Sequence, residues 1–330
     1  MEKFKWVIVG TGYIANQFAE GMREVKDAMI AAVVSRSAEN GRKYAKVHHA
    51  DSVYTDFEEM LGQEDIDAVY VAVPNDCHYA YIMAALEKGF PVLSEKPMVD
   101  NARQLDAVLK KAKEKNVFLM EGMWTRCFPA VIQTRKWMSE GRIGAPLTVR
   151  AFFDIQPDMN DWQPWKGQIR HAGGSLRDVG IYSVAMAHMV FPESPVNVYS
   201  VMKSNGEVDE SFQMLVTYKG GRAAFLSGAF NQISNASVEI VGEKGRIEIG
   251  PEFWHPSEAE LILKDGTKER FEQKYPETGF QYEIRAVQDC IRNGALECPH
   301  FTHEESRKIG DLIEQTRKSW GIIYVSDRED

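Results

Sequence analysis

Three side chains stand in sequence contexts that suit proton-transfer chemistry. Lys96 follows a short apolar run and precedes a proline, which restricts the backbone that carries the ammonium. Asp178 and Tyr182 are four positions apart and come shortly after the pair Gly173-Gly174. If Asp178 opens a helix, its carboxylate and the Tyr182 phenol share one face, and the glycines let a backbone approach a ligand closely. An ammonium, a carboxylate and a phenol can each donate, accept or orient a proton.

The N-terminal residues form a turn that could bind a pyrophosphate. An apolar run at 7–9 stops at the pattern Gly10-x-Gly12-x-x-Ala15, after which apolar residues recur at helical spacing. Gly10 allows a tight turn, Gly12 lets the backbone approach a phosphate, and the small Ala15 lets the helix lie close to the strand. The N–H groups of the helix N-terminus then face the anion. The pattern predicts dinucleotide binding by Gly10, Thr11, Gly12, Tyr13 and Ile14.

The end of the next predicted strand, 29–34, indicates which dinucleotide binds. An acidic residue about 20 positions past the glycines holds the ribose of NAD, whereas an arginine suits the 2′-phosphate of NADP. This strand ends in Ser35-Arg36-Ser37, with no Asp or Glu. We therefore predict NADP as the cofactor. If Arg36 only stacks on the adenine, the protein would not distinguish NADP from NAD.

Strands and helices alternate through the first part of the chain. Helical patterns occur at 38–47, 56–61 and 101–115, and strand-like runs occur at 67–73, 91–94 and 117–121. This alternation predicts an α/β fold, with a Rossmann-type, doubly wound parallel sheet over residues 1–122. Ligands of such sheets bind at the carboxyl ends of the strands. The predicted cofactor-binding residues at these ends are Val73, Pro74, Asn75, His78, Glu95 and Lys96. In alternative interpretations, His78 only hydrogen-bonds at a helix end and Lys96 forms a surface salt bridge with Glu95.

The sequence pattern changes after this domain. A helix is expected at 129–139, and residues 212–218 alternate with period two before a glycine turn. The alternation predicts pairing with residues 222–230, and later glycine turns separate further short strands. Residues 123–330 are therefore expected to form a second, α+β domain with a large, mostly antiparallel open sheet.

Composition limits the classes of protein to which the chain can belong. The 330 residues suggest two domains, and 44% hydrophobic and 26% charged residues are typical of a soluble globular protein. The formal charge of −9 argues against nucleic acid or an anionic membrane as the main partner. Met1 is followed almost at once by a strand, and no apolar run approaches the ~20 residues of a membrane span, so we expect neither a signal peptide nor a membrane anchor.

The cysteines and histidines carry no metal-binding pattern. The four cysteines show no CxxC spacing, which favours reduced thiols in a cytoplasmic protein. His48 and His49 are adjacent and point apart on a helix, while His300 and His303 have no companion cluster. No metal is therefore expected.

Taken together, the motifs resemble a known family. The N-terminal GxGxxA, the strand-end Pro74-Asn75 and the later Glu-Lys-Pro are similar to those of the glucose–fructose oxidoreductase/inositol dehydrogenase (Gfo/Idh/MocA) family. The segments 120–129, 173–182 and 253–256 resemble its branch of dimeric dihydrodiol dehydrogenases and NADP-dependent D-xylose dehydrogenases. The resemblance implies an NAD(P)-dependent oxidoreductase that transfers a hydride between nicotinamide and a sugar, a trans-dihydrodiol or a small carbonyl compound. It also implies a homo-oligomer, as a dimer, assembled through the C-terminal sheet.

The resemblance suggests roles for the proton-transfer residues. Much of the family has a His at the position of Tyr182, whereas the dihydrodiol branch has Tyr; a free Tyr titrates at about 10 and a His at about 6.5. A nearby Lys96 ammonium would stabilise a tyrosinate. We expect Tyr182 to donate and accept the proton, Lys96 to activate it and to hydrogen-bond the substrate, and Asp178 to orient the substrate hydroxyl or Lys96. In the alternative, Lys96 is the direct acid/base and Tyr182 only positions the substrate.

Several large side chains are candidates for the substrate pocket. Trp124 follows the last strand of the first domain, Trp162 and Trp165 lie in a loop long enough to be a lid, and Trp254 follows a turn. Their rings could stack on the C–H face of a pyranose or a dihydrodiol, although each could equally be a core residue. Arg126 could bind substrate oxygens or brace the domain boundary.

Two other functions remain open on the same fold. NAD-dependent glycosidases oxidise a sugar transiently and retain their cofactor, so bound nucleotide in the purified protein would favour them. A non-catalytic dinucleotide sensor is the other candidate. The presence of Lys96, Asp178 and Tyr182 argues against it, because a sensor needs no proton transfer.

Overall fold

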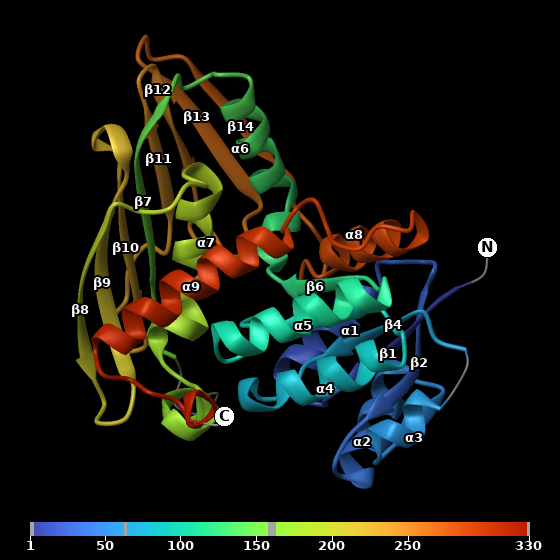
Figure 1. Cartoon of the computed structure of the whole chain (residues 1–330). Helices are drawn as coiled ribbons and strands as arrows, with labels where there is room; N and C mark the ends of the chain where they lie inside the picture. Colours follow the sequence, from blue (N-terminus) through green and yellow to red (C-terminus); the bar gives the residue numbers. More distant parts are fainter. Residues whose placement is uncertain (1–2, 63–64, 158–162, 329–330) are drawn as a thin grey trace. The chain divides into compact units, whose positions relative to one another are not determined.

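The computed structural model describes residues 3–62, 65–157 and 163–328 and contains two compact units (Figure 1). The first unit comprises the chain up to Trp124 together with Tyr275–His303, and the second comprises Thr125–Lys274 and the chain from Glu304 onward. The division into residues 1–122 and 123–330 remains our proposal for the domains. It does not include the return of Tyr275–His303 to the first unit, because packing rather than any local motif places that segment.

The first unit is built on a six-stranded parallel sheet. Strand β1 pairs in parallel with both β2 and β4, so the direction of winding changes at β1. In spatial order the strands are β3 (Ser52–Tyr54), β2 (Ala28–Val34), β1 (Phe4–Val9), β4 (Ala68–Val71), β5 (Val92–Glu95) and β6 (Leu119–Gly122). The predicted Rossmann-type sheet is confirmed, and it gains the short β3, which the sequence pattern did not indicate.

Helices cover both faces of this sheet. They are α1 (Tyr13–Met22), α2 (Ala38–His48), α3 (Phe57–Leu61), α4 (Asn75–Glu87), α5 (Ala102–Lys115) and α8 (Gln281–Arg292). Figure 1 shows α4 and α5 side by side, and their apolar residues Ile82 and Leu105 join Val69 of β4 in one core. On the opposite face, the Phe18 ring of α1 stacks on Tyr70 of β4 with centroids 3.7 Å apart.

Helix α8 packs against α1 although more than 250 residues separate them in the sequence. Phe280, which precedes α8, meets the Phe18 ring edge-on at 5.7 Å. The contact depends on Gly21, because a Cβ at that position would lie 2.7 Å from the Cβ of Phe280. The absence of a side chain at one position therefore allows the two helices to pack closely.

The second unit contains an eight-stranded sheet in which β7 and β10 pair in parallel and the other neighbours are antiparallel. In spatial order the strands are β14 (Lys268–Glu272), β13 (Glu258–Leu263), β12 (Gly245–Ile249), β11 (Val238–Gly242), β7 (Pro146–Asp154), β10 (Ala223–Ala229), β9 (Asp209–Thr217) and β8 (Asn197–Ser204). The predicted hairpin is confirmed: Thr217 of β9 opposes Ala223 of β10 across a turn with Gly220 and Gly221 at positive φ. The mostly antiparallel open sheet is therefore confirmed.

The helices of the second unit surround one face of this sheet. They are α6 (Pro129–Ser139), the π-helical segment η4 (Leu176–Gly180), α7 (Ile181–Val190) and α9 (His303–Ser319), with short 3₁₀ turns η1 (Trp124–Cys127), η2 (Pro164–Gly167), η3 (Ile169–His171), η5 (Lys219–Gly221) and η6 (Val325–Asp327). Gly180 lies against Gly228 of β10, where a Cβ would be 3.0 Å from the Gly180 Cα. This close approach holds η4 and α7 on the sheet. Within the described ranges, no helix is long and apolar enough to cross a bilayer.

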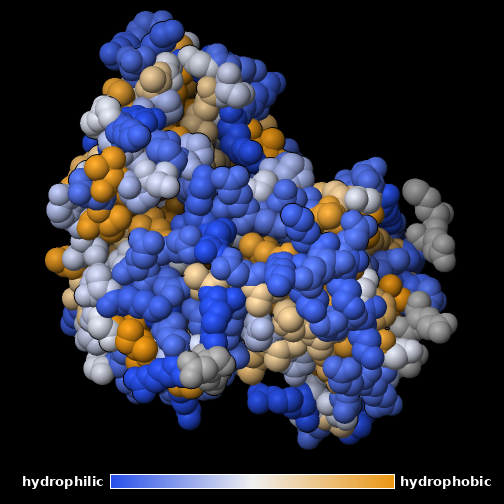
Figure 2. All heavy atoms as spheres, viewed as in Figure 1, coloured by the Kyte–Doolittle hydropathy of each residue, from blue (hydrophilic) through white to orange (hydrophobic). Residues whose placement is uncertain are grey.

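The other face of the second sheet carries exposed apolar side chains. Tyr199 and Val201 of β8 are 59% and 64% exposed, and Phe225 of β10 is 41% exposed. Figure 2 shows separate hydrophobic patches along the side where Figure 1 draws β8 and β9. Tyr199 and Phe225 both oppose Leu215 of β9, so these three side chains form one row across the strands.

Candidate active site

The glycine turn has the geometry of an anion-binding helix N-terminus. Gly10 has φ 114°, and a Cβ on it would lie 2.3 Å from the carbonyl oxygen of Ala72. Gly12 is the N-cap of α1, no side chain caps the helix, and its first turn contains no acidic residue. A Cβ on Gly12 would meet no atom within 4 Å. Uncapped N–H groups beside open backbone fit a pyrophosphate, so these residues suit a dinucleotide.

The end of β2 places the three residues expected to select the dinucleotide. Ser35 is buried, and its hydroxyl lies 3.5 Å from that of Thr11 in the glycine turn. The Ser37 hydroxyl accepts a hydrogen bond from the backbone N–H of Asn40 at 3.2 Å, so it caps α2. Arg36 is exposed, and its positive charge partly offsets the rise that burial causes in the pKa of Cys77 at the start of α4. Of these three residues, Arg36 is the most exposed.

Two neighbouring strand ends are tied together by His78. Its ring is buried, with Nδ1 3.0 Å from the carbonyl oxygen of Pro97 and Nε2 2.8 Å from that of Val73. Pro74 is the N-cap of α4, and Asn75 is buried in the first turn. His78 thereby connects the end of β4 to the residue that follows Lys96.

Glu95 holds the backbone of the Glu-Lys-Pro segment from inside the unit. One of its carboxylate oxygens accepts the Tyr70 hydroxyl at 2.6 Å, and the other accepts the Lys96 backbone N–H at 3.3 Å. Burial, followed by the charge of Glu95, raises the pKa of Tyr70 far above its usual value, so the phenol stays protonated and donates. Glu95 is 7% exposed, so its carboxylate lies in the interior of the first unit.

Asp178 and Tyr182 lie on either side of the junction between η4 and α7. The Asp178 carboxylate contacts the Lys166 ammonium at 2.8 Å, and its backbone N–H donates to the Gly174 carbonyl at 3.0 Å. Tyr182 is buried, and its ring lies 5.5 Å from that of Phe153 at the end of β7. In the second unit the Lys166 ammonium of η2 therefore meets the Asp178 carboxylate, and the Tyr182 phenol follows Asp178 by four residues, across the junction of η4 and α7.

The sequence motifs did not reveal Lys166 and Phe153 as neighbours of these residues. Phe153 stacks on Trp254 with centroids 4.1 Å apart, so Trp254 and Tyr182 contact the same ring. Lys166 lies in the loop expected to be a lid and has no motif around it. A cation within about 12 residues of Asp178 is too common a pattern to single out, and only the folded loop brings the two together.

The other predicted pocket residues have varied surroundings. Trp124 belongs to the first unit, where it stacks on Phe280 at 4.4 Å. Trp165 is half-buried and donates from its indole N–H to Gln163. Trp162 lies outside the described residues.

Arg126 belongs to the framework of the second unit. Its guanidinium is fully buried and contacts the carbonyl oxygen of Ala185 at 2.8 Å and the carboxylate of Glu305 at 3.1 Å. Burial lowers the pKa of Arg126 to about 10. These contacts lie within the second unit, between η1, α7 and α9, whereas the sequence offered substrate binding or bracing of the domain boundary.

Similarity to known proteins agrees with this geometry. The profile described as "Oxidoreductase family, NAD-binding Rossmann fold" (Gfo/Idh/MocA) matches residues 4–123, and the Gfo/Idh/MocA C-terminal domain matches residues 131–248. The trans-1,2-dihydrobenzene-1,2-diol dehydrogenase of Sus scrofa is 30% identical over 341 residues, covering 98% of this chain and 99% of that protein. The chain belongs to the Gfo/Idh/MocA family. It is an NAD(P)-dependent dehydrogenase, and the resemblance seen in the sequence motifs is confirmed.

Solved structures of lower identity share the whole fold. A 3-ketoreductase from Actinomadura kijaniata, in complex with NADP and TDP-benzene, has a TM-score of 0.82 at 23% identity, covering 96% of this chain and 98% of that one. Levoglucosan dehydrogenase, in complex with NADH and levoglucosan, has a TM-score of 0.86 at 18% identity with the same coverage. At these identities the likeness concerns the fold. A nicotinamide cofactor is common to both structures, whereas its phosphorylation state differs.

Proposed function

We propose that this family member is an NADP-preferring oxidoreductase that interconverts a hydroxyl and a carbonyl group on a sugar, a trans-dihydrodiol or a small carbonyl compound. The observation that carries the proposal is the placement of Asp178 and Tyr182 on either side of the junction of η4 and α7, with Lys166 on the Asp178 carboxylate, in a chain with an uncapped glycine turn. The name of the Sus scrofa relative supports a diol, and the levoglucosan in a structural neighbour supports a sugar.

In the proposed reaction, nicotinamide supplies the hydride acceptor or donor. The protein must handle the hydroxyl proton and stabilise the developing alkoxide. Tyr182 donates and accepts this proton, Lys96 activates the phenol and hydrogen-bonds the substrate oxygen, and Asp178 orients the substrate hydroxyl. The 2.8 Å contact between Asp178 and Lys166 limits the rotamers of the carboxylate, which suits an orienting role.

A Tyr182→Phe variant tests this assignment. Loss of the phenol should reduce kcat by about 10²–10⁴-fold if Tyr182 is the acid/base, with nucleotide affinity unchanged. The assay follows reduced nicotinamide by absorbance with a panel of aldoses, dihydrodiols and dicarbonyls, with a chromogenic glycoside included. A fall of only a few-fold would transfer the role to Lys96, and turnover of the glycoside alone would replace the proposed reaction class.

The preference for NADP is proposed from Arg36 at the end of β2. Charged hydrogen bonds to a 2′-phosphate are worth about 1.5–3 kcal/mol, so Arg36→Ala should lower kcat/KM for NADP by about 10–100-fold and leave the value for NAD nearly unchanged. Lys43→Ala, which removes an exposed cation that pairs with Glu39 on α2, is the matched control. A wild-type protein that prefers NAD would contradict the proposal.

We also propose that two copies associate through the exposed face of the second sheet. The row formed by Tyr199, Leu215 and Phe225 continues across the sheet to Arg150 of β7 and Glu239 of β11, which form an ion pair. One half of the row is therefore apolar and the other half is charged. A self-complementary surface of this kind suits a twofold dimer. Val201→Asp should yield monomers in light scattering, whereas Val47→Asp on α2 should not. A monomeric wild-type protein would refute the proposal.

A cytoplasmic location is proposed from the state of the thiols. Within the described residues, Cys77, Cys127, Cys290 and Cys298 are thiols and not disulfides, as expected in a reducing compartment. Cell fractionation tests the location, and recovery of the protein from an oxidising compartment would contradict it.

A further inference from the structure

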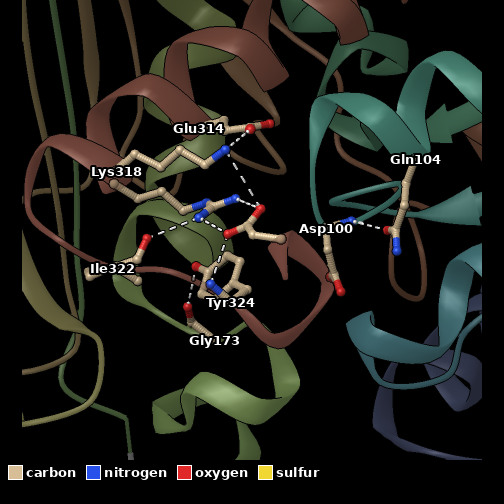
Figure 3. A network of polar contacts seen from close by, with 9 residues as sticks. Asp100, Gln104, Gly173, Glu314, Lys318, Ile322 and Tyr324 are labelled. Atoms are coloured by element: carbon tan, nitrogen blue, oxygen red, sulfur yellow. Dashed lines mark hydrogen bonds and ion pairs between the residues drawn. The ribbon is translucent and has the colours of Figure 1, made fainter. Parts of the chain in front are cut away.

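The chain that follows α9 folds back onto the loop that leads to Asp178. Residues Gly321–Asp327, here called the C-terminal strap, place Ile322 and Tyr324 in a small buried cluster with Ala172 and Val208. Figure 3 shows Tyr324 with its hydroxyl directed at Gly173, and Ile322 beside it. The Tyr324 hydroxyl donates to the Gly173 carbonyl at 2.7 Å, across 151 positions of sequence.

The strap is itself held by a buried ion pair. The Arg317 guanidinium of α9 contacts both oxygens of Asp327, at 2.6 and 2.8 Å, and also donates to the Ile322 carbonyl at 3.0 Å. The side chains of Arg317 and Asp327 are 1% and 4% exposed. The same guanidinium lies 4.1 Å from the centre of the Tyr324 ring, and that of Arg177 lies 5.2 Å from it. A two-pronged, desolvated pair of this kind fixes the position of the tyrosine.

The pair Gly173-Gly174 connects the strap to the predicted catalytic residues. Gly174 donates its N–H to the Lys166 carbonyl at 2.8 Å and accepts the Asp178 N–H at 3.0 Å. Lys166 and Asp178 then meet each other through their side chains at 2.8 Å. Neither glycine can be replaced without a shift, because a Cβ on Gly173 would lie 2.3 Å from the Lys166 carbonyl oxygen and one on Gly174 would lie 2.3 Å from Asp209.

We propose that Tyr324 is a positioning residue for Asp178, and that the C-terminal strap keeps the Gly173-Gly174 turn in the arrangement that the reaction needs. This inference rests on the proposed function. Tyr324 contacts two groups close to Asp178 in the chain: the carbonyl of Gly173, next to Gly174, and the side chain of Arg177, the residue directly before Asp178. The strap therefore acts on the rate of the chemical step and leaves nucleotide binding unaffected, since the glycine turn belongs to the other unit.

Tyr324→Phe tests the proposal, because it removes the hydrogen bond to the Gly173 carbonyl and keeps the ring beside Arg177 and Arg317. If loss of this bond is transmitted fully to the site, kcat falls by about threefold to tenfold. Tyr218→Phe is the matched control, since Tyr218 is another buried tyrosine of the second unit whose ring packs on Phe191. The full chain is assayed for kcat, KM, NADP affinity and Tm. The expected result is a lower kcat with unchanged NADP affinity for Tyr324→Phe and no change for Tyr218→Phe.

A double-mutant cycle separates positioning from a general loss of stability. In an Asp178→Asn background, Tyr324→Phe should have no further effect on kcat, because the residue it positions is already altered. Independent, multiplying effects in the double variant would overturn the proposal, as would an unchanged kcat in Tyr324→Phe alone. If Tyr324→Phe does not fold, Ile322→Val, which loosens the same cluster by a single methylene, is tested against the same criteria.

Limited trypsin cleavage tests the role of the C-terminal strap independently of the proposed function. Lys166 and Arg170 are trypsin sites in the segment that the strap covers, and Arg170 is exposed. Cleavage at these sites should be faster in Tyr324→Phe than in wild type, whatever reaction the protein catalyses. Faster cleavage without turnover of any oxidoreductase substrate would support the strap and refute the proposed function, whereas unchanged cleavage would refute the strap.

Discussion

Replacing Asp209 with asparagine should change how the stability of the second unit depends on pH. The Asp209 carboxylate lies below the start of η4, where one oxygen accepts the Ser175 hydroxyl at 2.7 Å and the Leu176 N–H at 2.6 Å. Asp209 is 1% exposed. Burial raises the pKa of Asp209 from 3.8 to about 6, and the hydrogen bonds from Ser175 and Leu176 only partly oppose this rise.

The direction in which stability changes with pH follows from which state, folded or unfolded, binds the proton more tightly. The folded-state pKa is the higher one, so the folded chain holds the proton over a range in which the unfolded chain has released it. Stability from this group is therefore fully present below about pH 4 and is lost as the pH rises through about 6. With values of 3.8 and about 6, the loss between about pH 4 and pH 7 is roughly 2 kcal/mol.

The comparison of Asp209→Asn with wild type at each pH cancels all other titrating groups. Hydrogen exchange of the peptide that contains Leu176, followed by mass spectrometry, reports the free energy of opening of this segment. Asparagine does not titrate. The stability of the variant relative to wild type should therefore increase by about 2 kcal/mol between about pH 4 and pH 7, whatever the difference between the two proteins at pH 4. A difference that stays constant with pH would refute the burial account.

Four further substitutions have defined outcomes in the first unit. Gly10→Ala should destabilise the fold by about 3 kcal/mol or more, because φ is 114° and the added Cβ meets the Ala72 carbonyl oxygen. Gly12→Ala adds a methyl group in open space. This variant should keep the wild-type Tm but lose nucleotide affinity in a fluorescence titration. Glu283→Gln should alter the free energy of unfolding at neutral pH by less than about 1 kcal/mol. Burial and then the charge of Glu95 raise the pKa of Glu283 far above its usual value, so the carboxyl is expected to be uncharged. Loss of the infrared carbonyl band of a protonated carboxyl in the variant would assign that band to Glu283, and a large loss of stability would contradict the neutral state. Tyr44→Phe removes the hydrogen bond to the Ala15 carbonyl at 2.6 Å and should cost about 1 kcal/mol in urea unfolding; a neutral result would mean that water replaces the bond.

Local sequence patterns determined most of the secondary structure and the family. The glycine turn, the buried strands and the hairpin around Gly220-Gly221 are encoded within windows of about ten residues, because periodicity and turn chemistry depend on near neighbours. The helix expected at 129–139 has those bounds in the structure. The strand ends that carry Asn75 and Lys96 could be located in the same way, since parallel strands of an α/β sheet present their carboxyl ends together.

Tertiary packing alone decided the surroundings of the candidate catalytic groups. Sequence spacing showed that Asp178 and Tyr182 follow a glycine pair, but the Lys166 ammonium on Asp178 comes from a folded loop, and the Tyr324 hydroxyl on Gly173 comes from 151 positions away. The sequence left open what Arg126 contacts, and in the structure its guanidinium is buried against the Ala185 carbonyl and the Glu305 carboxylate. These partners have no local signature, because a hydrogen bond or an ion pair between distant segments imposes no periodicity on either one and forms only when the fold brings them together.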